Sequence, residues 1–229
     1  MKLTVVLLPG MDGTGLLFQP FMDALGGEFD VKVVRYPTDE SLGYDELISI
    51  AHAAMPDQGP YVILGESFSG PIAISIAAAK PPGLVGLVLA CTFARNPRPR
   101  LALLKNLIGL LPVSRVPTLV TKHLLLGRFS TVRLLSVMTK AIGMVSDRAF
   151  DARLGAVLNV DVTNQLAQVA VPVLYLQATE DRLVPPSAEK LMSASCPCMR
   201  VVRFSAPHFL LQAAPDMAAQ AVREFVKAL

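Results

Sequence analysis

Six short and nearly continuous apolar runs, separated by segments with helical spacing, constrain the fold more than any other feature. The runs lie at residues 2–9, 29–37, 61–66, 84–93, 171–179 and 199–205. The intervening helix-like segments lie at residues 18–25, 44–55, 69–80, 187–195 and 216–229. Strands that are apolar on both faces are typical of a parallel sheet covered by helices on both sides. The pattern therefore predicts an α/β fold with a mostly parallel sheet of about six strands flanked by helices.

The alternation stops between residues 94 and 170. This segment is rich in leucine, has helical spacing and contains no convincing strand, and prolines 97, 99, 112 and 117 divide it into pieces. We expect a helical insertion at residues 94–170 that sits over a core formed by residues 1–93 and 171–229. A chain of 229 residues with 52% hydrophobic and only 6% aromatic residues can bury an aliphatic core as one such domain.

Charge is distributed unevenly along the chain. Residues 91–146 hold nine Lys and Arg residues and no Asp or Glu, out of 21 basic and 18 acidic residues in total. The rest of the chain therefore carries 12 basic against 18 acidic residues. A basic insertion favours an anionic substrate part or an anionic lipid surface, although a solvated outer face would have the same composition. Nucleic acid is not expected, because aromatic residues are sparse.

The cysteines and the N-terminal run bear on location and on metal binding. Cys91 ends an apolar run and is expected to be a small buried hydrophobe. Cys196 and Cys198 have no nearby histidine and make a poor metal site. An odd number of cysteines without a disulfide pattern predicts a reducing, cytoplasmic location. The first apolar run is too short for a signal peptide, and no run of 18 apolar residues predicts a membrane span.

The stretch "ILGESFSG" at residues 63–70 carries a Gly-x-Ser pattern at the end of a predicted strand. Such a serine can sit on a sharp strand-to-helix turn with its hydroxyl raised above the sheet. The turn requires small neighbours, which are Gly65 on one side and Ser69 and Gly70 on the other. Ser69 stands where the pattern usually has glycine, and its small side chain can be held by a slightly adjusted turn.

A serine nucleophile needs a base, and the base needs an orienting acid. The chain has three histidines. His52 lies on a predicted helix and His123 lies in the insertion, whereas His208 follows the last strand, at the same sheet edge as Ser67. The acid should follow another strand at this edge, where Glu180 and Asp181 are available. Asp181 is preferred because the turn at residues 182–185 closes over it, while Glu180 is expected at the surface.

With these residues the chain resembles the α/β-hydrolase superfamily over nearly its whole length. The resemblance rests on "LLPGMDGTG", "GESFSG", "ATEDRLVP" and "APHFLL", and on the order Ser, Asp, His. It implies Ser67 as the nucleophile, His208 as the base and Asp181 as the orienting acid. It also implies that the insertion is the family's helical cap and that the first edge strands of the family sheet are missing. Small esterases, thioesterases and the hydrolase portions of some plant acyltransferases look most similar.

The segment "PGMDGTG" at residues 9–15 is expected to complete the site. Backbone N–H groups stabilise the oxyanion of acyl transfer, and we expect these donors at Met11 and Phe68. Asp12 beside them would oppose catalysis unless it braces the glycine turn. The segment lacks the lysine of a phosphate-binding loop, so nucleotide binding is not expected.

These features predict a serine hydrolase that cleaves a carboxylic ester or thioester with an apolar acyl part, without metal or cofactor. The basic insertion suggests a substrate linked to CoA or to a carrier protein, or contact with an anionic lipid surface. Two alternatives stay open. The fold can serve as a ligand receptor without turnover, and the same triad can transfer the acyl group to an alcohol or cleave a carbon–carbon bond.

Overall fold

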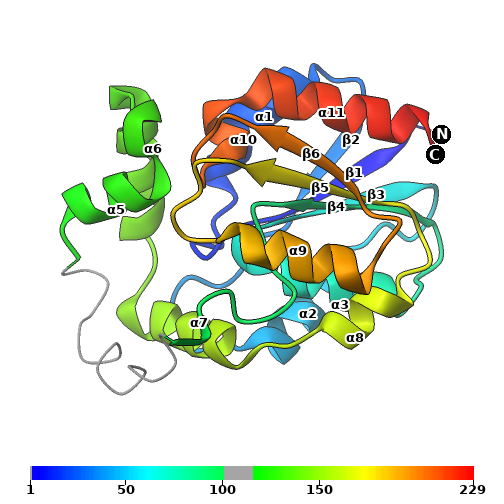
Figure 1. Cartoon of the computed structure of the whole chain (residues 1–229), viewed down its shortest axis with the longest axis horizontal. Coiled ribbons are helices and arrows are strands. Elements are labelled where there is room, and N and C mark those ends of the chain that lie inside the picture. Colours follow the sequence, from blue (N-terminus) through cyan, green and yellow to red (C-terminus); the bar gives the residue numbers. More distant parts are fainter. Residues whose placement is uncertain (1, 101–115) are drawn as a thin grey trace.

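A computed structural model of the chain describes residues 2–100 and 116–229 and confirms the predicted α/β fold. Six strands form one parallel sheet in the order β2-β1-β3-β4-β5-β6 (Figure 1). The strands are β1 (Thr4–Leu8), β2 (Asp30–Val33), β3 (Tyr61–Glu66), β4 (Leu84–Ala90), β5 (Val173–Ala178) and β6 (Arg200–Phe204). The strand order reverses between β1 and β3. Such a switch point opens a crevice at the carboxyl ends of the strands, where ligands bind.

Helices cover both faces of the sheet (Figure 1). One face carries α1 (Gln19–Leu25), α10 (Leu210–Ala213) and α11 (Pro215–Lys227), and the opposite face carries α2 (Tyr44–Ala53), α3 (Gly70–Ala78), α8 (Thr163–Gln168) and α9 (Pro186–Ser195). All residues of β3 and β5 are buried, while most residues of the edge strands β2 and β6 are partly or fully exposed. This difference explains why the central strands read as continuous apolar runs in the sequence.

The segment between β4 and β5 is mostly helical from Thr118 onwards, whereas residues 91–98 are irregular and Arg95 forms an isolated β-bridge with Asp161. It contains α5 (Thr118–Leu125), the 3₁₀ helix η5 (Gly127–Phe129), α6 (Val132–Gly143), α7 (Asp147–Asn159) and α8. Helices α5 and α6 stand beyond the sheet edge, whereas α8 packs on α3 and α9 and buries Leu166 in the main core (Figure 1). The end of the inserted segment therefore contributes to the core. The helix expected at residues 101–112, with Lys105, and the following Arg115 lie outside the described residues.

Within residues 2–100 and 116–229, no helix combines the length and the apolar character needed to cross a membrane.

Candidate active site

The turn after β3 has the sharp geometry expected of the Gly-x-Ser pattern. Ser67 adopts a positive φ of 49°, which is strained for a residue with a side chain. A Cβ at Gly65 would lie 2.7 Å from the Ala73 Cβ, and one at Gly70 would lie 1.9 Å from the Thr92 Oγ1. The Thr92 hydroxyl in turn donates to the Ser67 carbonyl. Small residues on both sides therefore let α3 pack closely and hold Ser67 at the strand end.

The structure brings together the three side chains that the sequence order predicted. The Ser67 Oγ lies 2.8 Å from the His208 Nε2, and the His208 Nδ1 lies 2.7 Å from the Asp181 Oδ2. Asp181 also accepts hydrogen bonds from the backbone N–H groups of Leu183 and Val184, at 2.8 and 2.9 Å. Because Asp181 can only accept, Nδ1 carries the proton and Nε2 is left to accept the Ser67 hydroxyl proton.

Burial and charge act in opposite directions on His208. The side chains of His208 and Asp181 are each 4% exposed. Burial alone would lower the pKa of His208, but the charge and hydrogen bond of Asp181 and the charge of Glu66 raise it above 6.5. A positive charge on His208 is therefore stabilised by Asp181 and Glu66.

The other candidates considered from the sequence are placed elsewhere. His123 lies on α5, where both its ring nitrogens and its carbonyl lie near the Arg182 guanidinium. His52 is exposed on α2. Glu180 forms a two-point ion pair with Arg128, with contacts of 2.8 and 2.5 Å. Among the described residues, only His208 and Asp181 form a hydrogen-bonded chain with the Ser67 hydroxyl.

Residues 9–15 form the loop after β1, which we call the β1 loop, beside the turn that carries Ser67. Asp12 accepts hydrogen bonds from the backbone N–H and hydroxyl of Thr14, so it braces this loop as the sequence suggested. Phe68 lies in the 3₁₀ helix η2 (Ser67–Ser69), at a position whose N–H has no partner within the helix. The Met11 N–H donates no hydrogen bond within the described residues. Their role as oxyanion donors stays a prediction.

Ser69 does more than fit the turn. It is fully buried, and its hydroxyl donates to the carbonyl of Pro9 at the start of the β1 loop. The hydroxyl of Tyr36 lies 2.8 Å from the Ser69 Oγ. Because the one Ser69 proton is directed at Pro9, Tyr36 is the donor in the second bond. Ser69 therefore ties the Ser67 turn to the β1 loop, a link that glycine could not make.

Arg153 is a site residue that sequence reasoning missed. It is fully buried on α7, and its guanidinium donates to the carbonyls of Met11 at 2.7 Å and Pro37 at 2.6 Å. Its Cζ lies 5.9 Å from the centre of the Tyr36 ring, and a Cβ at Gly13 would lie 2.8 Å from its Nη1. The available signal was its spacing of four residues from Ala149 and Val157, which places Arg153 on the apolar face of α7.

Glu66 is a buried carboxylic acid directly before Ser67. Gln212 donates to its Oε1 at 2.9 Å. Burial raises the pKa of Glu66 to about 7, with a further increase from the charge of Asp12, while the Gln212 hydrogen bond, His208 and the Gly10 N–H act in the opposite direction. Glu66 therefore changes its protonation state near neutral pH, and it directly precedes the candidate nucleophile Ser67.

Metal-ligating residues do not cluster in the described part of the chain, where no three His, Cys, Asp or Glu residues could hold an ion. The Cys196 and Cys198 sulfur atoms lie 3.7 Å apart, and Cys91 is buried behind the sheet edge.

A comparison with protein-family models matches residues 42–211 to the family described as "Serine aminopeptidase, S33". A comparison with curated proteins finds "Phytyl ester synthase 1, chloroplastic" of Arabidopsis thaliana, 32% identical over 104 residues. That match covers 41% of this chain and 15% of the relative, so the chain spans only a small part of that protein.

Solved structures share the fold over nearly the whole chain. The enol-lactonase from Burkholderia xenovorans LB400 has a TM-score of 0.86 and 15% identity, and the match covers 99% of this chain and 92% of that one. A thermophilic esterase from Thermogutta terrifontis has a TM-score of 0.80 and 20% identity, with 100% and 90% covered. At this identity the likeness is one of fold.

Proposed function

Because the chain belongs to the serine aminopeptidase S33 family of α/β hydrolases, we propose that it is a serine hydrolase that cleaves a carboxylic ester or thioester with an apolar acyl part. The observation that carries the proposal is the continuous hydrogen-bonded chain from Ser67 through His208 to Asp181, with distances of 2.8 and 2.7 Å. A serine hydroxyl is a weak nucleophile on its own, and this arrangement supplies both the base and the group that orients it.

The reaction proceeds in two steps. Ser67 attacks the substrate carbonyl carbon while His208 takes the serine proton, and the N–H groups of Met11 and Phe68 receive the oxyanion. His208 then gives its proton to the departing alcohol or thiol, which leaves an acyl group on Ser67. A water molecule that loses a proton to His208 then attacks this acyl group. The bond to the Ser67 oxygen breaks, His208 returns the proton to that oxygen, and the carboxylic acid is released.

An apolar cluster next to His208 supports an apolar acyl part. Leu17, Leu126 and Phe209 pack together with residues of α6, and the Phe209 N–H donates to the Leu125 carbonyl at 3.1 Å. The inserted helices therefore bring aliphatic side chains to the residue that follows His208. Charged acyl groups would lose solvation against this surface without gaining a partner.

The proposal for the leaving part of the substrate rests on the positive charge of the inserted segment. The inserted segment carries exposed basic residues, of which Arg95 and Arg128 pair with Asp161 and Glu180. Others, among them Arg100 and Arg133, form no ion pair within the described residues. A substrate linked to CoA or a carrier protein, or one presented at an anionic lipid surface, complements this charge.

Acyl transfer to an alcohol is a second candidate, because the matched segment resembles part of a protein named as an ester synthase. The same acyl group on Ser67 would then be attacked by an alcohol instead of water. Adding a long-chain alcohol to the assay and measuring the ratio of new ester to free acid separates the two activities.

The test of the proposed function uses a fluorophosphonate probe and p-nitrophenyl esters of increasing chain length. Labelling and turnover should both be lost in Ser67→Ala and His208→Ala. The matched controls are Ser136→Ala and His123→Gln, which remove the same kinds of side chain from the inserted helices and should retain activity. If the folded wild-type protein is labelled but turns over no ester or thioester, a receptor function replaces this proposal. If it is neither labelled nor active, the assigned site is wrong.

A further inference from the structure

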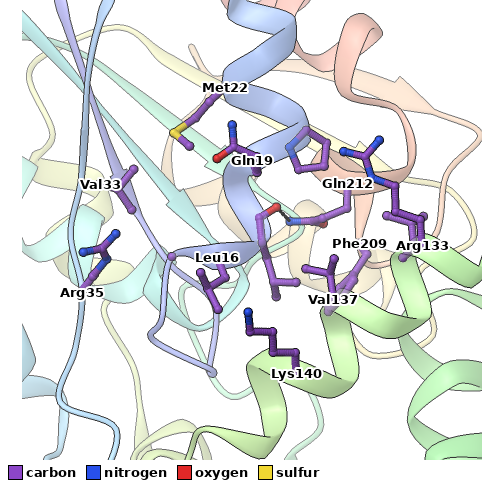
Figure 2. Close-up of a pocket in the computed structure, with 14 residues that line it drawn as sticks. Leu16, Gln19, Met22, Val33, Arg35, Arg133, Val137, Lys140, Phe209 and Gln212 are labelled. Carbon is purple, nitrogen blue, oxygen red and sulfur yellow. Dashed lines mark hydrogen bonds between the residues drawn. The ribbon is translucent and has the colours of Figure 1, made fainter.

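A cavity of about 310 Å³ lies away from the three triad side chains, between the start of α1, the end of β2 and helix α6. This volume is at the lower end of the range for small-molecule sites. Figure 2 shows its walls, to which α6 contributes Arg133, Val137 and Lys140. Neither Ser67, Asp181 nor His208 is among the described residues that line it.

The inner surface of the cavity is apolar. Its aliphatic and aromatic lining residues are Leu16, Leu17, Pro20, Met22, Val33, Leu134, Val137 and Phe209. Gln212 forms the part of the wall nearest the Ser67 turn. Its amide donates to the Leu17 carbonyl at 3.2 Å (Figure 2) and also to the Glu66 Oε1 at 2.9 Å. Gln212 therefore links the cavity wall to Glu66, the residue before Ser67.

The rim of the cavity is cationic. Arg35, Arg133 and Lys140 are exposed and lie on three sides of it (Figure 2). Within the described residues none of the three makes an ion pair or a side-chain hydrogen bond, and no Asp or Glu lines the cavity. Two acids accept hydrogen bonds from lining residues: the exposed Asp23 from Gln19 at 2.7 Å, and the buried Glu66 from Gln212 at 2.9 Å.

We propose that this cavity is a second binding site, which takes a single alkyl chain that ends in an anionic headgroup. The chain lies against the apolar walls and the headgroup lies at the rim among the three cations. The volume suits one chain. A carboxylate and a phosphate share the chemistry that the rim recognises, so the experiment compares both. The site does not depend on chemistry at Ser67.

Calorimetric titration with decanoate, decyl phosphate and decan-1-ol tests the proposal. At least one of the two anions should bind more tightly than the alcohol, and each methylene removed from the better anion should weaken binding roughly fourfold. Arg35→Glu, Arg133→Glu and Lys140→Glu should each weaken binding about fivefold. Lys190→Glu, the same charge change on the opposite face of the sheet, is the matched control and should bind as the wild type does. Val137→Trp should weaken binding by occupying part of the cavity.

Three outcomes would overturn the proposal. One is that the alcohol binds as well as both anions, or that neither anion binds. Another is that the charge-reversed variants, shown to be folded by circular dichroism, bind like Lys190→Glu. The third is that capping Ser67 with a small fluorophosphonate removes anion binding, which would place the ligand in front of the triad. Because binding is measured directly, these outcomes can be interpreted even if the protein does not hydrolyse esters.

Discussion

Replacing Glu66 by glutamine tests how the carboxyl group before Ser67 responds to its buried position. Glu66 is 5% exposed, and its pKa is raised from 4.5 to about 7 by burial and by the charge of Asp12. In the window between these two pKa values the folded state holds a proton that the unfolded state has lost. Stability therefore falls as the pH rises through this window. One pKa unit corresponds to 1.36 kcal/mol. The shift from 4.5 to about 7 therefore lowers the free energy of unfolding by about 3 kcal/mol once the pH is above both pKa values.

Glu66→Gln keeps an acceptor for the Gln212 amide but cannot ionise. The difference in free energy of unfolding between variant and wild type should therefore change by about 3 kcal/mol between pH 4 and pH 8, in favour of the variant at high pH. Urea unfolding followed by circular dichroism at several pH values measures it. If glutamine packs poorly at this position, the difference in free energy of unfolding shifts by the same amount at every pH. The dependence of this difference on pH therefore reports the ionisation of Glu66 alone. Glu40→Gln, at an exposed glutamate, controls for the change in net charge. A pH-independent difference for Glu66→Gln would refute the reasoning.

Three further predictions concern the candidate site. Ser69→Ala should lower stability by about 1–3 kcal/mol and reduce kcat/KM, because Pro9 and Tyr36 lose a buried partner; unfolding and esterase assays that match the wild type would contradict the assigned link. Arg153→Met should reduce kcat more than KM, since it releases the Met11 carbonyl and so the β1 loop; an effect on stability alone would assign Arg153 a purely structural role. The acid limb of the pH profile of kcat/KM should lie above pH 6.5, because His208 acts as a base only when neutral and its pKa is raised; a midpoint below 6.5 would exclude this.

The sheet and the triad were predictable because their signals are local. Each central strand is buried on both faces, so its sequence is a short apolar run wherever it occurs in the chain. Ser67 and Asp181 follow central strands and His208 follows the edge strand β6, and the parallel arrangement places all three at one sheet edge. The glycines at positions 65 and 70 already indicate in the sequence where the Ser67 turn leaves no room for a side chain.

The supports of the site were not predictable because their partners are distant in the sequence. Ser69 contacts Pro9 and Tyr36, which lie 60 and 33 positions away. From the pattern alone it was a tolerated substitute for glycine, whereas the structure gives it a hydrogen-bonding role. Arg153 belongs to a helix whose orientation over the sheet has no local signal. The cationic cavity likewise combines residues from α1, β2 and α6 that no periodicity relates.

The contact between Arg153 and the Met11 carbonyl spans 142 positions. During synthesis the β1 loop emerges first, but its stabilising guanidinium follows only after about two thirds of the chain has been made. Long-range contacts of this kind form late, because they must offset a large loss of chain entropy. A nascent chain can thus form its first strands before the β1 loop has its support from Arg153. For the same reason, exchanging the inserted helices for those of another α/β hydrolase would remove this support and alter the β1 loop.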